Sequence, residues 1–333
     1  MYLIEKAESI DQVPNYEEFV KKSGANLFYK KYWMKFHERN EEGVFYFYTR
    51  KGKRIESFLA LTSDKDGSYY SIPFWFGEEV FMQGNINSYI EEFEKLEGNS
   101  VVIGNVSEER AEELEKKGFI TYPSFVHPEL EISNMEEFWD SLDKNQRKNL
   151  KKAKKIAEKE TIEIKQVSTE KDLEDYYKLE KETMERKGDK PEPYEFWRDI
   201  LQTCPKDKIL FLLVRKDRIP IAGRISFIGD KRIFNFRGVS SIEFQEYRAN
   251  ELLHLHVIEE AVKRKIRYIN YGPDVFSMEG SYPFKKKFAN KDKILWEAVY
   301  PLTEKSQQET LKNAEEQNKK LRSFLSETRN NGT

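Results

Sequence analysis

Two stretches of similar pattern decide the fold of this chain: FYFYTRKGKRIESFLAL at residues 45–61 and LFLLVRKDRIPIAGRISF at residues 210–227. In each stretch an apolar segment is followed by a short charged turn and a second apolar segment, which is the pattern of a β-hairpin. The two stretches lie about half a chain apart, so we interpret them as copies of one α/β unit. Because hairpins with charged turns are common, the interpretation also needs the flanking segments.

The segments after each hairpin repeat as well. Each half has a further short apolar strand, at 69–72 and at 232–236, and then a strand that leads into a helix, at 101–104 before 107–117 and at 267–271 before 278–288. Antiparallel strands followed by β-α units predict a mixed α/β fold. We therefore expect two tandem domains, each with a mixed, mainly antiparallel sheet flanked by helices.

The chain of 333 residues is long enough for two such domains. We place the first at residues 1–132, the second at 133–302 with a basic entry helix at 134–160, and a helical tail at 303–333. The tail shows the three-and-four spacing of a coiled-coil seam, at Leu311, Ala314, Asn318, Leu321 and Leu325. So short a seam favours packing on its own domain, and hence a monomer or at most a weak homodimer.

The composition limits where the protein works and what it binds. The net charge is −2, so contact with a polyanion needs a local basic patch. The first residues do not have the pattern of a signal peptide. No window of the sequence is apolar over the length needed to span a membrane. The one cysteine, Cys204, ends a predicted helix and fits a reducing compartment better than a nucleophilic role. We expect a cytoplasmic protein.

Several common catalytic motifs are absent from the sequence. It contains no phosphate-binding loop of the Gly-x-x-x-x-Gly-Lys type, no dinucleotide fingerprint and no Gly-x-Ser-x-Gly elbow. With one cysteine and four scattered histidines we expect no metal site. His254 and His256 lie two positions apart on a predicted helix at 249–265, so they point in different directions, one toward the core or its rim and one toward the surface. Acyl transfer, which needs positioning and hydrogen bonds, stays open.

The most informative stretch is NYGPDVFSMEGSYPFKKKFA at residues 270–289. It follows a predicted strand, passes through a Gly- and Pro-rich turn and enters a short helix. Ligands bind at the carboxyl ends of strands in open α/β sheets. A lysine at the start of such a helix can hold a phosphate or stabilise the oxyanion of a tetrahedral intermediate. The alternative is that Lys285 and the two lysines after it form a solvated face.

This stretch resembles the carboxyl-terminal signature of the Fem-type peptidyltransferases, relatives of the GNAT acyltransferases. The signature contains Gly-x-x-x-Phe-Lys-x-x-Phe, which is matched in spacing by Gly280, Phe284, Lys285 and Phe288. The segment RKNLKKA at 147–153 is similar to the family's helix at the entry to its second domain, and KDRIPIAG at 216–223 is similar to its hairpin. The resemblance runs from about Trp139 to Tyr300, and the first half is similar in layout only.

The resemblance implies a function and a site. Fem-type enzymes have two GNAT-like domains and transfer amino acids from aminoacyl-tRNA to an amine of a peptidoglycan precursor, while other relatives use acyl-CoA. It implies no tightly bound cofactor and a catalytic role for Lys285. To Lys285 we add two catalytic candidates, Asp274, which could substitute for the family's Asp, and Tyr282, which could position or protonate a leaving group. Acceptor-binding positions would be Arg237, Tyr247, Tyr271 and Phe284. For Arg237 a structural ion pair, and for Tyr282 aromatic packing, are the alternatives.

Three departures from the family pattern bear on the donor. Asn270 stands where an Asp is frequent, and Ala289 replaces the closing Gly. In FQEYRAN, residues 244–250, Gln245 matches the pyrophosphate loop of GNAT enzymes, but both of its glycines are missing. Without them a pyrophosphate is harder to bind, which disfavours ordinary acetyl-CoA binding and favours either an aminoacyl-tRNA donor or a degenerate acyl-CoA site.

We therefore expect an N-acyltransferase that moves an aminoacyl or acyl group to an amine of a cell-envelope precursor, a peptide or a small molecule. Arg147, Lys148 and Lys151 on the basic helix would contact the donor phosphates together with Gln245, unless that helix is only a solvated charged face. One alternative is an acyl-CoA-dependent N-acetyltransferase of a small amine. Another is a scaffold without activity that binds tRNA.

Overall fold

The computed structural model describes residues 4–72 and 86–330, which form two compact units. Unit 1 comprises the chain up to residue 127 together with 273–283 and 292 onward, and unit 2 comprises 128–272 and 284–291. The predicted division at 132/133 lies near the first of these crossings. Two later segments, 273–283 and the residues from 292, belong to unit 1, although the sequence pattern grouped 273–302 with the second half.

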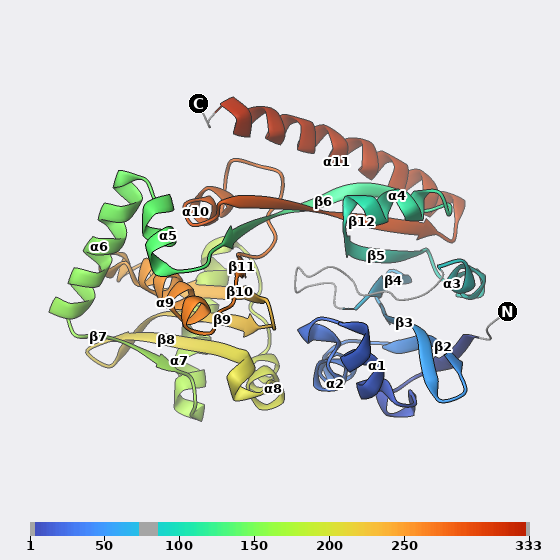
Figure 1. Ribbon diagram of the computed structural model, residues 1–333, viewed down its shortest axis with the longest axis horizontal. Coiled ribbons are helices and arrows are strands. Elements are labelled where there is room, and N and C mark those ends of the chain that lie inside the picture. Colours follow the sequence, from blue (N-terminus) through green and yellow to red (C-terminus); the bar gives the residue numbers. More distant parts are fainter. Residues whose placement is uncertain (1–3, 73–85, 331–333) are drawn as a thin grey trace. The chain divides into compact units, whose positions relative to one another are not determined.

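Unit 1 contains one sheet whose strands follow the order β1-β2-β3-β4-β5-β12-β6 (Figure 1). Its strands are β1 (Ile4–Ala7), β2 (Phe45–Lys51), β3 (Arg54–Ser63), β4 (Ser68–Ser71), β5 (Ser100–Val106), β12 (Lys291–Pro301) and the first part of β6 (Ile120–Glu131). Its helices are α1 (Tyr16–Ser23), α2 (Lys31–Asn40), α3 (Ile86–Phe93), α4 (Glu108–Glu115) and α11 (Glu304–Asn330), with the 3₁₀ turns η1 (Ile10–Gln12) and η2 (Leu27–Tyr29).

Unit 2 contains the strand order β6-β11-β10-β9-β8-β7. After the end of β6, its strands are β7 (Ile162–Gln166), β8 (Ile209–Lys216), β9 (Ile219–Ile228), β10 (Arg232–Ser240) and β11 (Tyr268–Asn270). Its helices are α5 (Met135–Ser141), α6 (Lys144–Lys159), α7 (Glu170–Lys187), α8 (Tyr194–Thr203) and α9 (Ala249–Lys263), with η3 (Lys206–Lys208) and η4 (Gln245–Tyr247). The short helix α10 (Tyr282–Lys286) begins in unit 1 and ends in unit 2.

The internal repeat predicted from the hairpins is present. In unit 1, β2, β3 and β4 are antiparallel and β4 is parallel to β5; in unit 2, β8, β9 and β10 are antiparallel and β10 is parallel to β11. The β8–β9 turn has positive φ at Asp217 (48°) and Arg218 (71°). Two left-handed residues give the backbone twist that a tight hairpin requires. The predicted fold class, a mixed α/β fold with mainly antiparallel strands flanked by helices, is thereby confirmed, and all the described strands belong to one 12-stranded sheet.

Helices α7 and α9 cover opposite faces of the unit 2 sheet (Figure 1). A Cβ atom at Gly223 would meet the ring of Tyr176 on α7, whereas the side chain of Arg224 meets His254 on α9. Neighbouring residues of a strand point to opposite faces, so β9 separates two environments. The core on the α9 side includes Leu253, Val257 and Ile269. The polar side chains described below therefore lie in two groups, one on the α9 face of the sheet and one on the α7 face.

Two predicted helices differ in detail. The segment expected to be helical over 278–288 forms only α10, in which the ring of Tyr282 packs against Phe324. In α11, Ala314 and Phe324 are buried in unit 1, whereas Leu311 and Leu325 of the predicted seam are 49% and 37% exposed. The tail packs on its own unit as expected, but through Phe324, because aromatic partners at Phe276 and Tyr282 are available there.

The predicted basic helix at 134–160 is two helices. Leu142 is extended, and the Asp143 side chain accepts hydrogen bonds from the backbone of Asn145 and Gln146 to cap α6.

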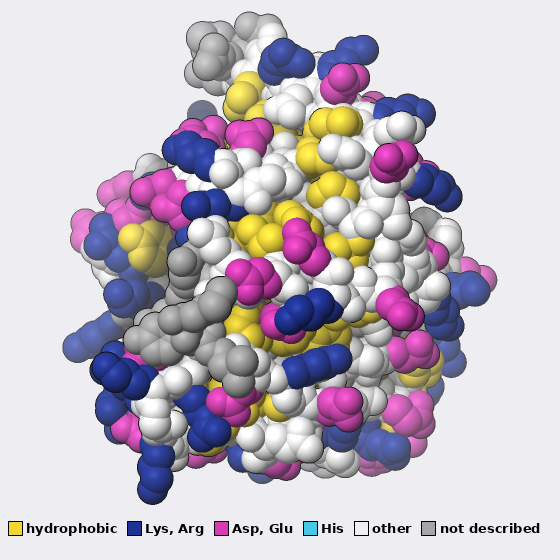
Figure 2. Space-filling model, turned by 90° about the vertical axis from the view of Figure 1, so that its right-hand side faces the viewer, with side chains coloured by type: hydrophobic (Ala, Val, Ile, Leu, Met, Phe, Trp, Pro, Cys, Tyr) yellow, Lys and Arg dark blue, Asp and Glu magenta, His cyan; other side chains and the backbone are white. Residues whose placement is uncertain are grey.

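On the face drawn in Figure 2, basic and acidic side chains are interspersed and are not separated by sign. Among the helices of the described segments, none combines the length and apolar character needed to cross a membrane.

Candidate active site

Strands β10 and β11 of unit 2 separate soon after they begin. Their parallel pairing runs only from Arg232↔Tyr268 to Phe234↔Asn270, while β10 continues to Ser240 with β9 as its partner. A register shift between Asn235 and Arg237 accompanies the separation. The edge of β10 beyond Phe234 is therefore open on the side of β11, at the carboxyl end of the parallel pair, where α/β sheets bind ligands. We call this feature the β10/β11 opening.

The turn after β11 begins at this opening. The Gly272 N–H donates to the Asn270 side chain over 2.7 Å, and Gly272 has φ +81°. A Cβ atom at Gly272 would lie 3.1 Å from the carbonyl oxygen of Asn235 on β10. Only glycine fits both the left-handed backbone and this close approach. The amide of Asn270 accepts the turn's hydrogen bond, so this position needs no carboxylate to hold the backbone.

Lys285 lies at the same turn. Its partly buried side chain places Nζ 3.4 Å from the carbonyl oxygen of Gly272. Phe284 of α10 and Phe288, two residues beyond the end of α10, both pack against His254 of α9, with ring centroids 5.2 and 4.5 Å away. These two ring contacts hold the end of α10 against α9 on both sides of Lys285 in the sequence.

Behind Lys285 lies a buried arginine–histidine pair. Arg224 on β9 is 7% exposed, and its Nη2 donates to His254 Nε2 over 2.8 Å. Burial lowers the pKa of Arg224 to about 10. Burial, with Arg224 and Lys285 nearby, lowers the pKa of His254 well below its usual range, so the imidazole is neutral. The phenol of Tyr271 is buried beside Arg224, and burial raises its pKa.

A second polar cluster occupies the α7 face. The fully buried Glu180 carboxylate lies 3.8 Å from Arg237 Nε, and Arg237 Nη2 lies 3.8 Å from Glu192. Burial raises the pKa of Glu180, an effect that the nearby Arg237 partly offsets. The Arg237 guanidinium also lies over the ring of Trp197, 5.6 Å from its centroid. Arg237 is therefore held by acidic and aromatic partners near the bulge in β10.

The other predicted catalytic residues lie in unit 1. Asp274 accepts a hydrogen bond from Ser281, and its backbone pairs with Val126. The Tyr282 hydroxyl donates to Asp292 over 3.0 Å, while its ring packs on Phe324. Lys285 belongs to unit 2, so the structure groups Asp274 and Tyr282 separately from it. Aromatic packing accounts for the burial of Tyr282, and the proposed roles of both residues stay predictions.

The predicted donor loop precedes α9. Gln245 is exposed, and Tyr247 is partly buried with Lys216 Nζ 5.8 Å from its ring centroid. Arg248 has φ 53°, so this chain makes the left-handed turn without glycine. Glu251 in the first helical turn pairs with Arg248 at 3.6 Å. An acidic residue there opposes a phosphate on the helix N-terminus.

Helix α6 contacts both η4 and α9. Arg147 is partly buried and donates to the backbone of Leu142. The exposed lysines of α6 are Lys144, Lys148, Lys151, Lys152, Lys154, Lys155 and Lys159. Within the described part of the chain, only two of them form ion pairs, Lys154 with Glu259 and Lys159 with Glu160. The structure therefore places a basic helix beside the donor loop.

The structure also places the cysteine and the two neighbouring histidines singled out from the sequence. Cys204 is buried, and burial raises the pKa of its thiol to about 12, which does not suit a nucleophile. His254 is buried and His256 partly exposed, as their spacing predicted. Within the described segments, no three side chains of His, Cys, Asp or Glu converge as metal ligands would.

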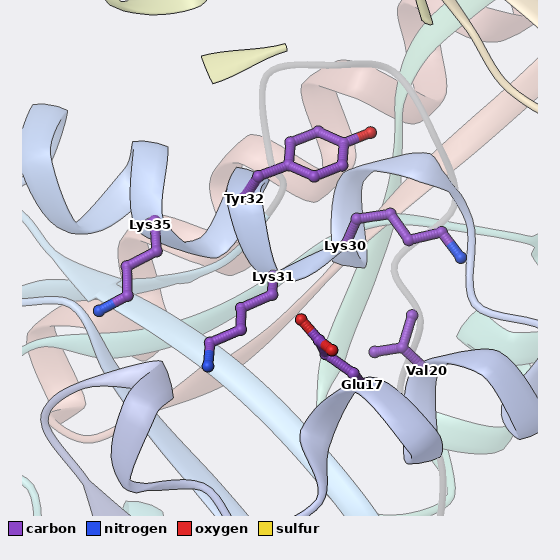
Figure 3. A pocket seen from close by; sticks show the side chains of 6 residues that line it. All are labelled: Glu17, Val20, Lys30, Lys31, Tyr32 and Lys35. Carbon is purple, nitrogen blue, oxygen red and sulfur yellow. The ribbon is translucent and has the colours of Figure 1, made fainter. Parts of the chain in front are cut away.

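Unit 1 has a cavity of about 510 Å³ lined by Glu17, Val20, Lys30, Lys31, Tyr32 and Lys35. Figure 3 shows Lys31 and Lys35 pointing the same way and Tyr32 pointing away from them. Both lysines are ion-paired with Asp11, and Lys35 also with Glu38. An anionic ligand in this cavity would have to compete with these acids.

Three residues of these clusters were not among those predicted from the sequence: Arg224, Glu180 and Asn235. Arg224 interrupts an apolar strand, and Glu180 falls four positions after Tyr176 on the buried stripe of α7. Charged residues in such positions are rarely buried unless they are paired or functional. The third, Asn235, lies at the β10 bulge, where its Oδ1 accepts from Ser226. An isolated asparagine in a strand gave no comparable signal.

Known proteins share the fold of this chain. Residues 144–286, most of which lie in unit 2, match the model of the acetyltransferase (GNAT) domain. The structure of FemX is similar with a TM-score of 0.68 and 14% identity, over 91% of this chain and 99% of that one. L-PGS from Bacillus licheniformis is similar with a TM-score of 0.61 and 12% identity, over 92% and 97%.

A tandem GNAT protein from the clavulanic acid biosynthesis pathway is also similar, with a TM-score of 0.54 and 11% identity, over 90% of this chain and 99% of that one. A comparison of the sequence with curated proteins gives no significant match. The predicted resemblance to Fem-type and GNAT proteins is thus confirmed for the fold.

Proposed function

We propose that this protein is an N-acyltransferase that moves an aminoacyl or acyl group from an activated donor to an amine. The observation that carries the proposal is the position of Lys285: its Nζ lies 3.4 Å from the Gly272 carbonyl at the β10/β11 opening of a GNAT-type unit. An ammonium group fixed at that edge is placed to stabilise negative charge on a carbonyl oxygen under attack.

The reaction needs no external oxidant or reductant. The acceptor nitrogen forms a bond to the donor carbonyl carbon, the carbonyl oxygen becomes an oxyanion near Lys285, and the tetrahedral intermediate then collapses. The bond to the leaving oxygen of a ribose ester, or the sulfur of a thioester, breaks, and the proton lost by the amine leaves with that group. Arg237, held by Glu180 and Trp197, would bind an anionic part of the acceptor.

Aminoacyl-tRNA is our preferred donor. The turn before α9 lacks the two glycines of a pyrophosphate loop and carries Glu251 at the helix start. Beside it, α6 presents exposed lysines, including Lys148 and Lys151, that suit an extended phosphate backbone better than a single pyrophosphate. The acceptor we favour is an amine of a cell-envelope precursor, by analogy with Fem-type enzymes; a peptide or a small amine would use the same chemistry.

One observation supports acyl-CoA as the alternative donor. Arg248 adopts the left-handed backbone that glycine supplies in a phosphate-binding turn, and it directly precedes the amides of α9. An acyl-CoA-dependent N-acetyltransferase of a small amine is therefore a second candidate. The third, an inactive scaffold that binds tRNA through α6, predicts nucleic-acid binding and no transfer.

A two-donor experiment tests the proposal. The purified protein is incubated with an amine panel and either aminoacyl-tRNA carrying a labelled amino acid or acetyl-CoA. Transfer is followed as label in the amine product or as released thiol. We expect labelled amide from the tRNA donor. Thiol release with no reaction of aminoacyl-tRNA would select the acyl-CoA alternative. Salt-sensitive tRNA binding with no product from either donor would select the scaffold.

A further inference from the structure

Arg224 is a buried cation for which the described residues supply no anion. Its guanidinium hydrogen bonds to His254, and among the described residues no aspartate or glutamate is ion-paired with it. Burying a charge without a counter-ion is strongly unfavourable, because the desolvation of the ion is not compensated. Unit 2 elsewhere pairs such arginines: Arg215, for example, lies 2.8 Å from Asp172 and 3.0 Å from Asp175. Arg224 is an exception to this pattern.

The histidine does not compensate for the charge. A guanidinium only donates hydrogen bonds, so His254 Nε2 must be the acceptor in the Arg224–His254 contact. The neutral ring then carries its proton on Nδ1, which becomes another donor. The pair therefore keeps one full positive charge and adds a donor to it. Lys285 contributes a further positive charge near the same ring.

The atoms around this pair are rich in donors. Arg224 Nε, His254 Nδ1, Asn235 Nδ2 and the Tyr271 hydroxyl are all buried and have no hydrogen-bond partner within the described part of the chain. All four side chains lie on the α9 side of β9 and β10 or on the turn after β11. Buried polar groups in native proteins normally have partners, so a cluster of orphaned donors indicates a missing acceptor.

The guanidinium is also reachable from the sheet edge. Gly238 pairs with Arg224 across β9 and β10 and is exposed. A Cβ atom placed on Gly238 would lie 3.4 Å from Arg224 Nη2. Because β11 has already separated from β10 at this point, a ligand lying along the open edge reaches the guanidinium across a residue that has no side chain.

We propose that Arg224, positioned by His254, binds an anionic oxygen group, a carboxylate or a phosphate, of the substrate that occupies the β10/β11 opening. The ligand supplies the counter-ion and the hydrogen-bond acceptor that are missing among the described residues. The assignment of this anion to a transferase substrate rests on the proposed function, but the binding of an anion at Arg224 does not. The two statements are therefore tested separately.

Anion binding is measured by thermal unfolding of the full chain in acetate, in inorganic phosphate and in chloride at matched ionic strength. A ligand that binds only the folded state raises the Tm. We expect acetate or phosphate to raise the Tm of the wild type above its value in chloride, and the anion with the larger shift identifies the substrate group. In Arg224→Met this shift is lost, while Arg198→Met, an exposed arginine in the same unit, keeps it.

Gly238→Val provides a second variant that retains the guanidinium. Its side chain covers Nη2 at ordinary contact distance on an exposed strand position, so the protein should fold, and we expect the anion shift to be lost. If Arg224→Met unfolds, this variant decides. Equal anion shifts in the wild type and in Gly238→Val, or the absence of any shift in the wild type, would overturn the proposal and make Arg224 a structural partner of His254. Neither result depends on whether acyl transfer is found.

Discussion

The ammonium group of Lys285 lies 3.4 Å from the carbonyl oxygen of Gly272, so the lysine of the Phe-Lys-x-x-Phe pattern meets the turn that follows β11. Gly272 in turn approaches the backbone of Asn235 on β10. These contacts connect the short helix α10 to both strands that border the opening. The position of the lysine therefore depends on the backbone of this turn as well as on its own helix.

Gly272→Ala should weaken both stability and activity. The substitution places a side chain at φ +81° and only 3.1 Å from a carbonyl oxygen, and the backbone strain alone costs about 1–3 kcal/mol. We expect a loss in the free energy of unfolding at the upper end of that range, measured by urea denaturation, and reduced transfer activity because the Lys285 contact shifts.

Gly188→Ala is the matched control for this change. Gly188 ends α7 with φ +75°, and no atom lies within 4 Å of an added Cβ. Gly188→Ala should lose only the part of the free energy of unfolding that is due to backbone strain, and it should retain transfer activity. If both variants lose the same stability and the same activity, the close approach of Gly272 to β10 has no special importance.

Because of the buried carboxyl group of Glu180, the free energy of unfolding should fall as the pH rises. Burial raises its folded-state pKa above the ordinary value of 4.5, so the folded protein binds more protons than the unfolded chain just above that pH. Stability therefore falls as the carboxyl ionises. Glu180→Gln stays neutral, so its stability relative to the wild type should increase as the pH rises from about 4 to about 7.

Urea unfolding across this pH range measures the effect. A Glu192→Gln variant serves as the control, because Glu192 is 44% exposed and contacts the same arginine. If the difference between Glu180→Gln and the wild type does not change with pH, the Glu180 carboxylate is already compensated by Arg237.

Much of the fold was predictable from local patterns. The two hairpins follow from apolar segments on either side of charged turns, and Lys285 follows from its two flanking phenylalanines. No local sequence pattern indicates that residues 273–283 belong to unit 1. Their place there involves the pairing of Asp274 with Val126, two residues that lie far apart in the sequence. The seam of α11 was misjudged for the same reason: Phe324 is buried by Phe276 and Tyr282, which no spacing within the helix reveals.

The site was predictable only in part. The family resemblance pointed to Lys285 and Arg237, whereas Arg224 and Glu180 were not predicted, although each interrupts an apolar stripe. A periodicity analysis that asks only which residues are apolar treats such charges as exceptions. The partners of these charged residues come from elements distant in the sequence and are known only from the structure. Helix α9 places His254 next to Arg224, and strand β10 places Arg237 next to Glu180.

The basic helix α6 should bind tRNA through its exposed lysines. Removing one lysine that binds a phosphate reduces the slope of log Kobs against log salt concentration by about 1. We expect Lys148→Gln and Lys151→Gln each to weaken tRNA binding and reduce that slope, as measured by filter binding at several salt concentrations. Lys165→Gln, an exposed lysine of β7 paired with Glu163, should change neither. If Lys148→Gln and Lys151→Gln keep the wild-type slope, as Lys165→Gln is expected to, α6 is excluded as the contact surface.

Cys204 should be unreactive in the folded protein. Burial raises the pKa of its thiol to about 12, so almost no thiolate is present at neutral pH. We expect a thiol reagent to label native protein far more slowly than urea-unfolded protein, and Cys204→Ala to retain transfer activity. Rapid labelling of the native state accompanied by loss of activity would restore the thiol as a catalytic candidate.

The most direct measurement compares Lys285→Met with Lys287→Met in single-turnover transfer, using the donor and amine identified by the two-donor experiment. Lys287 is an exposed lysine of the same short segment and lies over the Phe284 ring, so it controls for the loss of one positive charge. Removing a group that stabilises an oxyanion slows the chemical step by about 100-fold or more. We expect that loss in Lys285→Met and a near-normal rate in Lys287→Met, whereas an unchanged rate in Lys285→Met would show that the ammonium group at the β10/β11 opening takes no part in acyl transfer.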